Sequence, residues 1–513
     1  MHDASRLHPH HVETPGPGDA RRRAIALVVL CMCALTTAID ITITNVALPF
    51  IGRDLDASVA DLQWVIDAYN LALAGLLVLG GGLADRFGRR KVFLAGYALF
   101  GLGCLLAAIS PSTSALIAAR VVMGIGAAGV IAPALAIVAV LYPPEERARA
   151  ISLWAVFGAA GLAVGPVLGG LLLDRFWWGS IFLVNVPIVA VGVVVGLRLI
   201  PESRKPDVGR LDVAGALLSV AGLGALLFGI IEGPERGWGS SGVVVGLAAG
   251  AVLTAAFVRH ELRAANPLLD LRILARPVVA AGSATLFVSY VVFTGMLFVL
   301  PQWLQDVEGE SIVSVGFLLV PFAGVFAFAS MRSAQVMARV GAAATIAGGL
   351  AISAAGIAAL AVTEDAAVAW TIAGTAVIGL GIAGLIAPPS TVVMNALPDA
   401  KAGDGSSLNM VSRFAGAAVG VAVVGSVLST VYLGRVDEAT TELSVSDTAK
   451  AEGSIQGALE VADDLSGSAG DALAAAARDA FNAGARVAYV VIAVLAAIAA
   501  VFAWFALRRV ADA

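Results

Sequence analysis

Charge is scarce in this chain. Of its 513 residues only 13% are Asp, Glu, Lys or Arg, whereas 59% are hydrophobic, and the mean hydropathy is +0.91. Soluble domains average about 25% charged and 45–50% apolar residues. A soluble protein of this composition would need a very large core with almost no amphipathic surface, so the composition favours an integral membrane protein.

Cysteine, histidine and lysine are also rare. The three cysteines, Cys31, Cys33 and Cys104, lie in apolar segments, which favours free thiols packed as small hydrophobic side chains over disulfides or metal ligands. None of the four lysines follows a glycine, so the chain has no phosphate-binding P-loop and ATP drive is unsupported. The only histidine outside the N-terminal tail is His260, which leaves no constellation for an enzyme. We therefore expect neither enzyme activity nor a cofactor.

Fourteen apolar segments fill the chain between residues 24 and 507. Each is about 20 residues long, enough for one helical crossing of a bilayer. The sequence therefore predicts an all-α integral membrane protein with fourteen transmembrane helices. The predicted spans are 24–51, 62–83, 92–110, 114–140, 151–173, 178–200, 211–231, 241–258, 277–300, 313–331, 342–362, 367–390, 406–430 and 484–507.

Lysine and arginine are unevenly divided between the two sides of the predicted bundle. Of the 32 basic residues, 23 fall in loops on the side of the N-terminus, seven fall on the other side and two lie within spans. Because cytoplasmic loops are enriched in Lys and Arg, both termini are expected in the cytoplasm. The net charge of −5 therefore says little about partners, and no nucleic-acid-binding patch is implied.

The chain ends are polar. Residues 1–23 form a tail without hydrophobic periodicity, which is typical of disorder, and residues 508–513 form a second short cytoplasmic tail. Metal capture by His8, His10 and His11 is the alternative to a solvated tail.

A weak internal repeat divides the chain. Gly81 to Gly88 follows the second span and Ala334 to Gly341 follows the tenth, with Arg and Gly at matching places. Both copies face the same side, so the repeat is parallel and predicts two six-helix halves with two helices inserted between them. Chance similarity is the alternative. The expected divisions are an N-terminal half at 24–200, an insert with linkers at 201–276, and a C-terminal half at 277–507.

The C-terminal half contains the only long outer loop, residues 431–483, which is acidic and rich in Ala. Part of it, Asp471 to Phe481, is expected to form a short helix at the membrane surface.

Two aspartates, Asp40 and Asp67, lie within the first two spans, and Arg120 lies within the fourth. A charge at bilayer depth costs roughly 2.5–3.5 kcal/mol, so these residues are functional candidates. Each aspartate belongs to a polar stripe at helical spacing, and two such stripes need a wet or polar cavity between helices. The stripes are Thr36, Thr37, Asp40 and Thr44, and Gln63, Asp67 and Asn70.

Carboxylates shielded from water point to proton-coupled transport, because they can bind a proton from one side and release it on the other when their surroundings change. Arg120 would favour the charged form of whichever aspartate it approaches, and alternating this contact would make a proton switch. A purely structural ion pair of Arg120 is the alternative.

Several segments resemble a known transporter family. Gly81 to Lys91 (GGLADRFGRRK) is similar to the loop signature of the major facilitator superfamily, and Gly158 to Gly170 (GAAGLAVGPVLGG) is similar to the antiporter signature of its drug exporters. The first span, Leu211 to Gly215 (LDVAG) and Pro301 to Leu304 (PQWL) resemble the fourteen-span drug:proton antiporter branch. One departure is Phe176 to Ser180, where the branch usually has Trp-Arg-Trp, so the outer entrance is left unassigned.

The resemblance assigns an inner-gate motif to the loop after the second span. Basic anchoring on the inner side explains part of its charge but not Asp85, because a carboxylate at the C-terminus of its own helix is disfavoured. The family implies that Asp85 pairs with basic groups across the two halves. The residues assigned to this motif are Gly81, Asp85, Arg86, Gly88, Arg89 and Arg90.

The antiporter-like segment has a physical pattern of its own. Its glycines are spaced by 3, 4 and 4 residues, which places them on one helix face where another backbone can approach closely. A proline within the segment removes one backbone hydrogen bond, so a hinge is expected, with ordinary small-residue packing as the alternative. The residues assigned to this motif are Gly158, Gly161, Gly165, Pro166, Gly169 and Gly170.

These observations predict a proton-driven antiporter that exports drugs, antibiotics or other amphipathic or cationic compounds by alternating access. A facilitator or proton-coupled transporter of an endogenous metabolite or lipid is the alternative. The excess of Arg over Lys indicates a genome rich in G and C. The resemblance implies a location in a bacterial inner membrane. The resemblance implies a monomer whose partners are a small substrate, protons and lipid.

Overall fold

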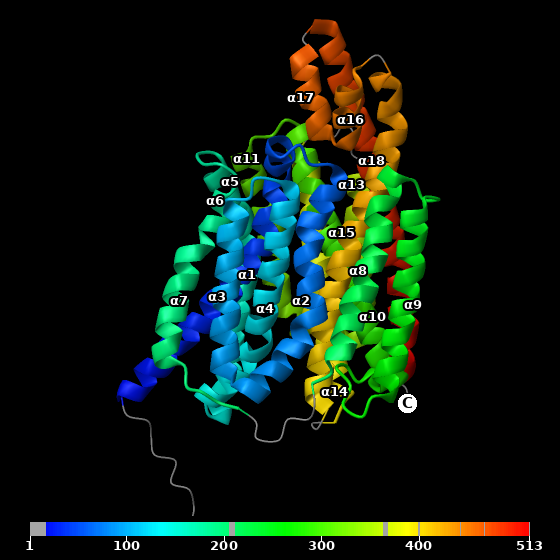
Figure 1. The fold of residues 1–513 in the computed structure, drawn as a ribbon. Helices are drawn as coiled ribbons and strands as arrows, with labels where there is room; N and C mark the ends of the chain where they lie inside the picture. The colour runs from blue at the N-terminus through cyan, green and yellow to red at the C-terminus, as the bar shows by residue number, and fades with distance from the viewer. Residues whose placement is uncertain are drawn as a thin grey trace, which may run out of the picture.

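The computed structural model describes residues 17–204, 211–362, 368–398, 401–441, 443–465 and 467–511. The secondary structure in these ranges is helical, and the bounds follow in chain order (Figure 1). The helices are α1 Pro17–Asp54, α2 Val59–Phe87, α3 Arg89–Ala108, α4 Thr113–Leu141, α5 Pro144–Leu173, α6 Ser180–Leu183, α7 Asn185–Leu199, α8 Val213–Arg236, α9 Ser241–Arg263, η1 Leu271–Ala275, α10 Pro277–Gln302, η2 Trp303–Val307, α11 Ile312–Leu318, α12 Val320–Val340, α13 Ala342–Ala361, α14 Val368–Asn395, α15 Ala402–Thr440, α16 Val445–Gly453, α17 Ile455–Leu465 and α18 Gly467–Ala511.

Fourteen segments of the described chain are long and apolar enough to cross a membrane, which confirms the predicted number. Three of them combine two adjacent elements, namely α6 with α7, α10 with η2, and α11 with α12. Several helices extend beyond the predicted spans, because an apolar run marks the hydrocarbon region and not the end of the helix.

Local signals explain where the functional helices begin. The Ser58 hydroxyl accepts a hydrogen bond from the Asp61 backbone N–H at 3.2 Å, and the Asp61 carboxylate accepts one from the Ser58 backbone at 3.2 Å. This capping box starts α2 and places Asp67 two turns into the helix. Ser112 caps α4 in the same manner through the Ala115 N–H.

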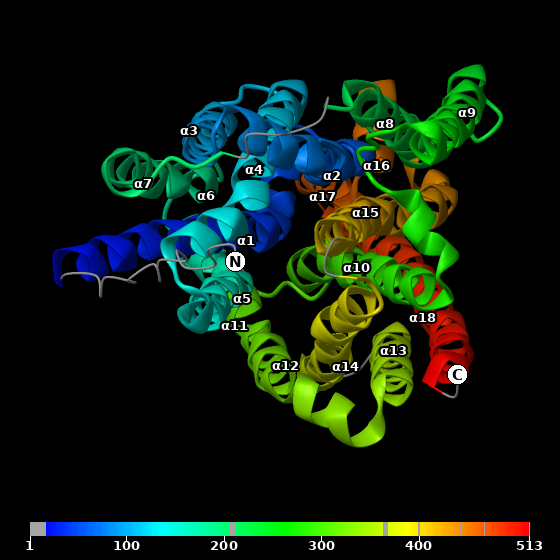
Figure 2. The ribbon, with the colours of Figure 1, turned by 90° about the horizontal axis from the view of Figure 1, so that it is seen from below.

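The transmembrane helices form two groups. In the first group α1 packs against α5 and α7, and α4 packs against α2 and α3. In the second group α10 packs against α15, and α13 packs against α14 and α18. We call α1–α7 the N-terminal half and α10–α15 with α18 the C-terminal half; Figure 2 shows them side by side.

The inserted helices α8 and α9 lie together at one edge of the bundle (Figure 2). Helix α8 contacts both halves. On one side the Trp64 indole of α2 donates to Glu232 at 3.1 Å, and on the other the Ser426 hydroxyl of α15 donates to the Ile230 carbonyl at 2.6 Å. Helix α9 packs mainly on α8 and is otherwise largely exposed, as a helix facing lipid would be.

The outer segment differs from the loop expected at 431–483. Helix α15 continues to Thr440, α16 and α17 form a helical hairpin, and α18 begins at Gly467, so Asp471 to Phe481 belong to one long helix (Figure 1). The segment is rich in Ala and buries the apolar face of α17, both of which favour helix. We call residues 431–483 the outer cap.

The start of α1 and the end of α18 lie at the opposite end of the bundle from the outer cap (Figure 1), and we call this the inner end. Residues 17–23, which were expected to belong to a disordered tail, are part of α1. Residues 1–16, with all four tail histidines, and residues 512–513 lie outside the described residues.

Candidate functional site

The fully buried ion pair between Asp40 of α1 and Arg120 of α4 is the centre of the candidate site. Arg120 Nη1 lies 2.6 Å from Asp40 Oδ2, and the two residues are 1% and 0% exposed. Sequence reasoning named both residues and left open which aspartate Arg120 contacts. The structure selects Asp40.

Further contacts hold the Arg120 guanidinium in one orientation. Its Nε donates to the Val65 carbonyl of α2 at 2.8 Å, and its central carbon lies 4.6 Å from the centre of the Tyr69 ring. The Phe182 ring lies at 5.9 Å on α6. A cation in contact with a carboxylate, a carbonyl and an aromatic face is stabilised in a buried position. Arg120 thereby ties α1, α2 and α4 together.

Asp67 is also fully buried, on α2, and is not part of this ion pair. Neither of its carboxylate oxygens makes a hydrogen bond of ordinary geometry in the described part of the chain, and the Asn70 side chain, three residues later on α2, is the polar group beside it. An uncompensated buried carboxylate is costly, so each such group calls for an explanation.

A cavity with about 810 Å³ of empty space lies between the two halves, next to these residues. Asp40 and Asp67 do not line the cavity, but Thr37 of the first polar stripe and Asn70 of the second do. Among its lining residues in the described structure none is charged. The lining residues are Ala34, Thr37, Ala38, Ile41, Asn70, Ile131, Trp154, Gly158, Leu162, Tyr290, Phe293, Thr294, Met410, Phe414 and Ala417.

Other members of the predicted stripes point elsewhere. The Thr36 hydroxyl donates to the Cys33 carbonyl at 3.0 Å, and the Thr44 hydroxyl donates to the Asp40 carbonyl at 2.8 Å. Gln63 donates to the Ala422 carbonyl of α15 at 2.9 Å, across the two halves. The stripes therefore serve helix packing as well as the cavity.

Four aromatic rings form a ladder beside the cavity. Tyr290 and Phe293 of α10 line it, and Phe293 stacks on Phe322 of α12, which stacks on Phe326, with ring centres 6.0 and 6.2 Å apart. An adjoining cavity with about 540 Å³ of empty space is lined by all four rings. No local signal in the sequence distinguishes Phe322 and Phe326, because aromatic residues are common in apolar runs.

The antiporter-like glycines of α5 lie against α1. A Cβ atom at Gly161 would lie 2.6 Å from the Leu35 carbonyl oxygen, closer than real Cβ atoms come. Gly165 and Gly169 meet α1 in the same way, whereas a Cβ at Gly158 would lie 4.0 Å from the Ala34 Cβ. The close approach predicted from the glycine spacing is therefore present along most of the motif.

The end of this motif faces the C-terminal half. A Cβ at Gly170 would lie 2.8 Å from the Ile312 carbonyl oxygen of α11, and one at Gly316 would lie 2.8 Å from the Pro166 carbonyl oxygen. Helices α5 and α11 therefore touch backbone to backbone, which closes this part of the outer side.

The outer ends of the halves are also joined by polar contacts. Arg53 of α1 forms an ion pair with Asp306 of η2, and Gln305 donates to the Val46 carbonyl at 3.1 Å. Gln456 of the outer cap donates to the second oxygen of Asp306 at 2.7 Å. We call the contacts of Arg53, Gln305, Asp306 and Gln456 the outer latch. No local sequence pattern indicates it, because its members are up to several hundred residues apart.

The outer cap is held to the N-terminal half as well. Lys450 of α16 pairs with Asp56, in the turn after α1, at 2.8 Å and with Glu460 of α17 at 2.7 Å. The departure from the family pattern at Phe176 to Ser180 includes Trp178, whose indole donates to Asp54 at 2.5 Å. Tryptophan thus takes part in the polar contacts at this entrance.

The inner-gate motif lines a cavity at the inner end, with about 1110 Å³ of empty space. Gly81, Asp85 and Arg89 face Ser406 and Ser407 of α15 across it. Arg89 Nη2 lies 2.8 Å from Asp85 Oδ1, an ion pair within the N-terminal half. Pairing of Asp85 across the two halves stays a prediction.

The rest of the motif shapes the turn between α2 and α3. Gly88 has φ of +115°, a conformation that other residues rarely adopt. The Arg90 backbone N–H donates to Glu202 at 3.1 Å, and the Arg86 guanidinium lies 5.6 Å from the centre of the Phe87 ring. The motif therefore combines a tight turn with charged side chains at the inner end.

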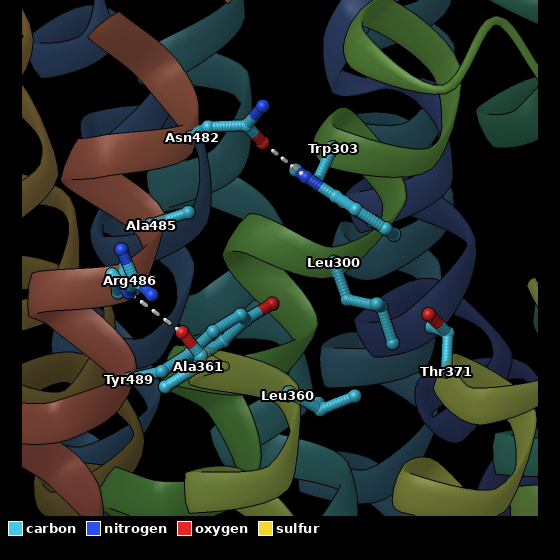
Figure 3. Close-up of a pocket in the computed structure, with 9 residues that line it drawn as sticks. All are labelled: Leu300, Trp303, Leu360, Ala361, Thr371, Asn482, Ala485, Arg486 and Tyr489. Atoms are coloured by element: carbon cyan, nitrogen blue, oxygen red, sulfur yellow. Dashed lines mark hydrogen bonds between the residues drawn. The ribbon is translucent and has the colours of Figure 1, made fainter. Parts of the chain in front are cut away.

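A smaller cavity lies within the C-terminal half, between α10, α13, α14 and α18 (Figure 3). There the Trp303 indole donates to Asn482 at 2.6 Å, and Arg486 Nε donates to the Ala361 carbonyl at 3.0 Å. Because its lining comes from one half only, this cavity lies off the path between the halves.

Comparison with known proteins decides the family. The model of the major facilitator superfamily matches residues 30–421, which is most of the chain. The chain belongs to this superfamily. This confirms the family expected from the sequence motifs.

Two relatives have names that describe transport. The multidrug resistance protein Stp of Mycobacterium tuberculosis is 35% identical over 83% of this chain and 80% of its own length. The multidrug efflux pump LfrA of Mycolicibacterium smegmatis is 34% identical over 97% of this chain and 99% of its own length.

A solved structure confirms the fold. A bacterial homologue of the human lysosomal transporter Spinster, in an inward-facing and unoccupied conformation, superposes with a TM-score of 0.67. The similarity covers 95% of this chain and 97% of the other at 19% sequence identity.

Proposed function

We propose that the protein is a proton-coupled antiporter that exports drugs, antibiotics or other amphipathic compounds from a bacterial cell. The observation that carries this proposal is the buried Asp40–Arg120 ion pair on helices that also line the central cavity. The names of the relatives Stp and LfrA support the substrate class.

Asp40 and Asp67 are the proposed proton-binding groups, and Arg120 is the switch. Protonation of Asp40 removes the negative charge that holds Arg120 Nη1, which frees α1 from α4. Asp67 is fully buried on α2 and forms no ion pair among the described residues, which makes it the second candidate for binding a proton. Release of either proton then requires a change in surroundings, which the movement of the two halves supplies.

The cavity suits amphipathic molecules. Trp154, Tyr290, Phe293 and Phe414 offer apolar ring surface, and Thr37 offers a hydroxyl. Aromatic faces bind both flat apolar rings and lipophilic cations, so a cationic cargo does not need a carboxylate in direct contact.

Alternating access follows from contacts at the two ends. The outer latch and the α5–α11 contact close the outer side, whereas the inner cavity shares Ile131 and Met410 with the central one and continues it towards the inner end. In the outward-facing state the outer latch opens and the inner-gate motif around Asp85 pairs with the opposite half. The glycine face of α5 and Pro166 allow α5 to shift against α1.

The remaining assignments complete the proposal. We place the protein in the bacterial inner membrane as a monomer with both termini in the cytoplasm, driven by the proton gradient without a cofactor. It is not an enzyme and has no nucleic-acid partner. The two halves at 24–200 and 277–507 move as the rocking units, with the insert at 201–276 between them.

Uptake of a fluorescent dye into energised inverted vesicles, which corresponds to export from the cell, tests the proposal. We expect proton-driven uptake of ethidium by wild type, abolished by a protonophore and by Asp40→Asn or Asp67→Asn. The matched control is Asp464→Asn, which removes an exposed carboxylate of α17 and should leave transport unchanged. Flux that withstands both the protonophore and the two variants would contradict proton coupling and indicate a facilitator.

A further inference from the structure

Three potential metal ligands meet at the inner ends of the inserted helices. Asp212 precedes α8, and His260 and Glu261 lie in the last turn of α9. One ligand atom from each residue lies within 4.8 Å of the other two. His260 Nε2 is 2.8 Å from Asp212 Oδ1 and 2.9 Å from Oδ2. The cluster lies apart from the central cavity and takes no part in the proposed transport reaction.

The burial of the Glu261 carboxylate is not explained by its packing. The residue is 0% exposed, and its Oε2 accepts a hydrogen bond from the Leu269 backbone N–H at 2.8 Å. Its Oε1 has no hydrogen-bond partner in the ranges that the structure describes. A buried oxygen without a partner destabilises the folded state, and contact with a cation would remove this cost.

The first turn of α8 leaves space for both carboxylates. A Cβ at Gly215 would lie 2.8 Å from Asp212 Oδ2 and would collide with Glu261 Oε1, so the two carboxylates converge over a residue without a side chain. Two carboxylates this close repel each other unless a cation or a proton lies between them.

Asp212 is suited to act as an anionic ligand. Its Oδ1 accepts a hydrogen bond from the Gly215 N–H at 2.8 Å, which fixes the carboxylate beside His260. The His260 side chain is 35% exposed, which gives an ion a path from solvent.

We propose that Asp212, His260 and Glu261 bind a divalent transition-metal ion, with Zn²⁺ bound more tightly than Mn²⁺. An imidazole nitrogen with two carboxylates and no thiolate is a ligand set for Zn²⁺ or Mn²⁺, and the imidazole disfavours Mg²⁺ and Ca²⁺. A tetrahedral ion about 2.0–2.1 Å from its ligands holds them about 3.3 Å apart. This separation is longer than the 2.8 Å between His260 Nε2 and Asp212 Oδ1 and shorter than the 4.8 Å within which all three ligand atoms lie, so small side-chain shifts suffice.

Such an ion would stiffen the junction between the insert and the C-terminal half. Glu261 already holds the loop after α9 through Leu269. The next residue, Asp270, accepts a hydrogen bond from Lys401, at the start of α15, at 2.7 Å. The metal would therefore join α8, α9 and this loop at a point in contact with the moving half.

The test uses the full chain, purified without a polyhistidine tag and with His2, His8, His10 and His11 changed to Gln. His260 is then the only histidine in the protein. Titration with Zn²⁺ after chelator treatment should give one ion per chain, and Zn²⁺ but not Mg²⁺ should protect His260 from modification by diethyl pyrocarbonate. His260→Gln and Glu261→Gln should each weaken Zn²⁺ binding at least about tenfold.

Asp212→Asn controls for misfolding, because Asn is also a good N-cap residue. This variant should keep α8 folded and still weaken Zn²⁺ binding. Asp464→Asn is the remote control and should bind Zn²⁺ as the parent does. The proposal is overturned if the parent binds no stoichiometric Zn²⁺, if Zn²⁺ leaves His260 reactive, or if the three variants bind as tightly as the parent. Those results would leave a proton-bridged cluster with a capping role only.

Discussion

The Asp40–Arg120 pair allows a double-mutant cycle whose outcome follows from the structure. Removing one partner of a buried ion pair costs about 3–5 kcal/mol, because the other charge is left uncompensated. After Asp40→Asn, Arg120 still contacts the Val65 carbonyl and the Tyr69 ring. After Arg120→Gln, Asp40 loses its cation, and its Oδ1 already lacks a partner within the described residues. We therefore expect Arg120→Gln to be the more destabilising single change.

The double variant Asp40→Asn/Arg120→Gln removes both charges together, so it should be more stable than the sum of the two single losses predicts. We expect a coupling of at least about 1.5 kcal/mol, near the lower limit measured for close charge pairs. Unfolding by denaturant in lipid nanodiscs at neutral pH measures it. Single losses that add to within about 0.5 kcal/mol would show that the pair is not coupled and refute the reasoning.

Transport measurements on the same variants distinguish a role of the ion pair in proton coupling from a purely structural role. If Asp40 binds the transported proton, the double variant regains stability but not proton-driven efflux. If the double variant transports as wild type does, the pair is only structural, and the coupling role assigned to Asp40 and Arg120 is wrong.

Two further predictions concern packing and pH. Gly161→Ala should lower the free energy of unfolding by about 1–3 kcal/mol and reduce efflux, because its Cβ would overlap α1. Gly158→Ala has space beside it and should be tolerated. Equal losses of stability in denaturant unfolding would contradict the α1–α5 contact. Burial alone would raise the pKa of Asp270, but hydrogen bonds from Arg272 and Lys401 lower it to about 2. Because the folded-state pKa is depressed, Asp270→Asn should lower the melting temperature by a constant amount at pH 5–7. The difference in melting temperature from wild type should shrink as pH falls below about 4. A difference that does not depend on pH would exclude the ion pairs.

The membrane fold was predictable from sequence because bilayer thickness sets the length of each apolar run. The helix ends and the outer cap could not be predicted from the sequence. Helix α15 runs on to Thr440 and α18 starts at Gly467, well outside the hydrocarbon region, where hydropathy carries no information. The amphipathic spacing of α17 was present in the sequence but is weak evidence over eleven residues.

The candidate site was predictable in part. Intramembrane charge identified Asp40, Asp67 and Arg120, but the partner of Arg120 depends on how α1, α2 and α4 are rotated against one another, which one sequence does not show. Asp306 was missed because it lies at a span end, where an acidic residue has a ready explanation as a loop residue. Its partner Arg53 is 253 residues away, so no local spacing connects them.

Helix α1 connects the separate parts of this site. It carries Asp40, and its outer end carries Arg53 of the outer latch, so loss of the Asp40 charge should weaken the latch at a distance. In the native chain the Gln305 side chain donates to the Val46 carbonyl. The variant Gln305→Cys reports opening of the latch through its reaction with a membrane-impermeant maleimide. We expect faster labelling in Arg53→Ala, as the direct effect, and in Asp40→Asn, as the transmitted one. Labelling that rises in Arg53→Ala but not in Asp40→Asn would show that α1 does not couple proton binding to outer opening, and the signal would then have to pass through Asp67 and α2.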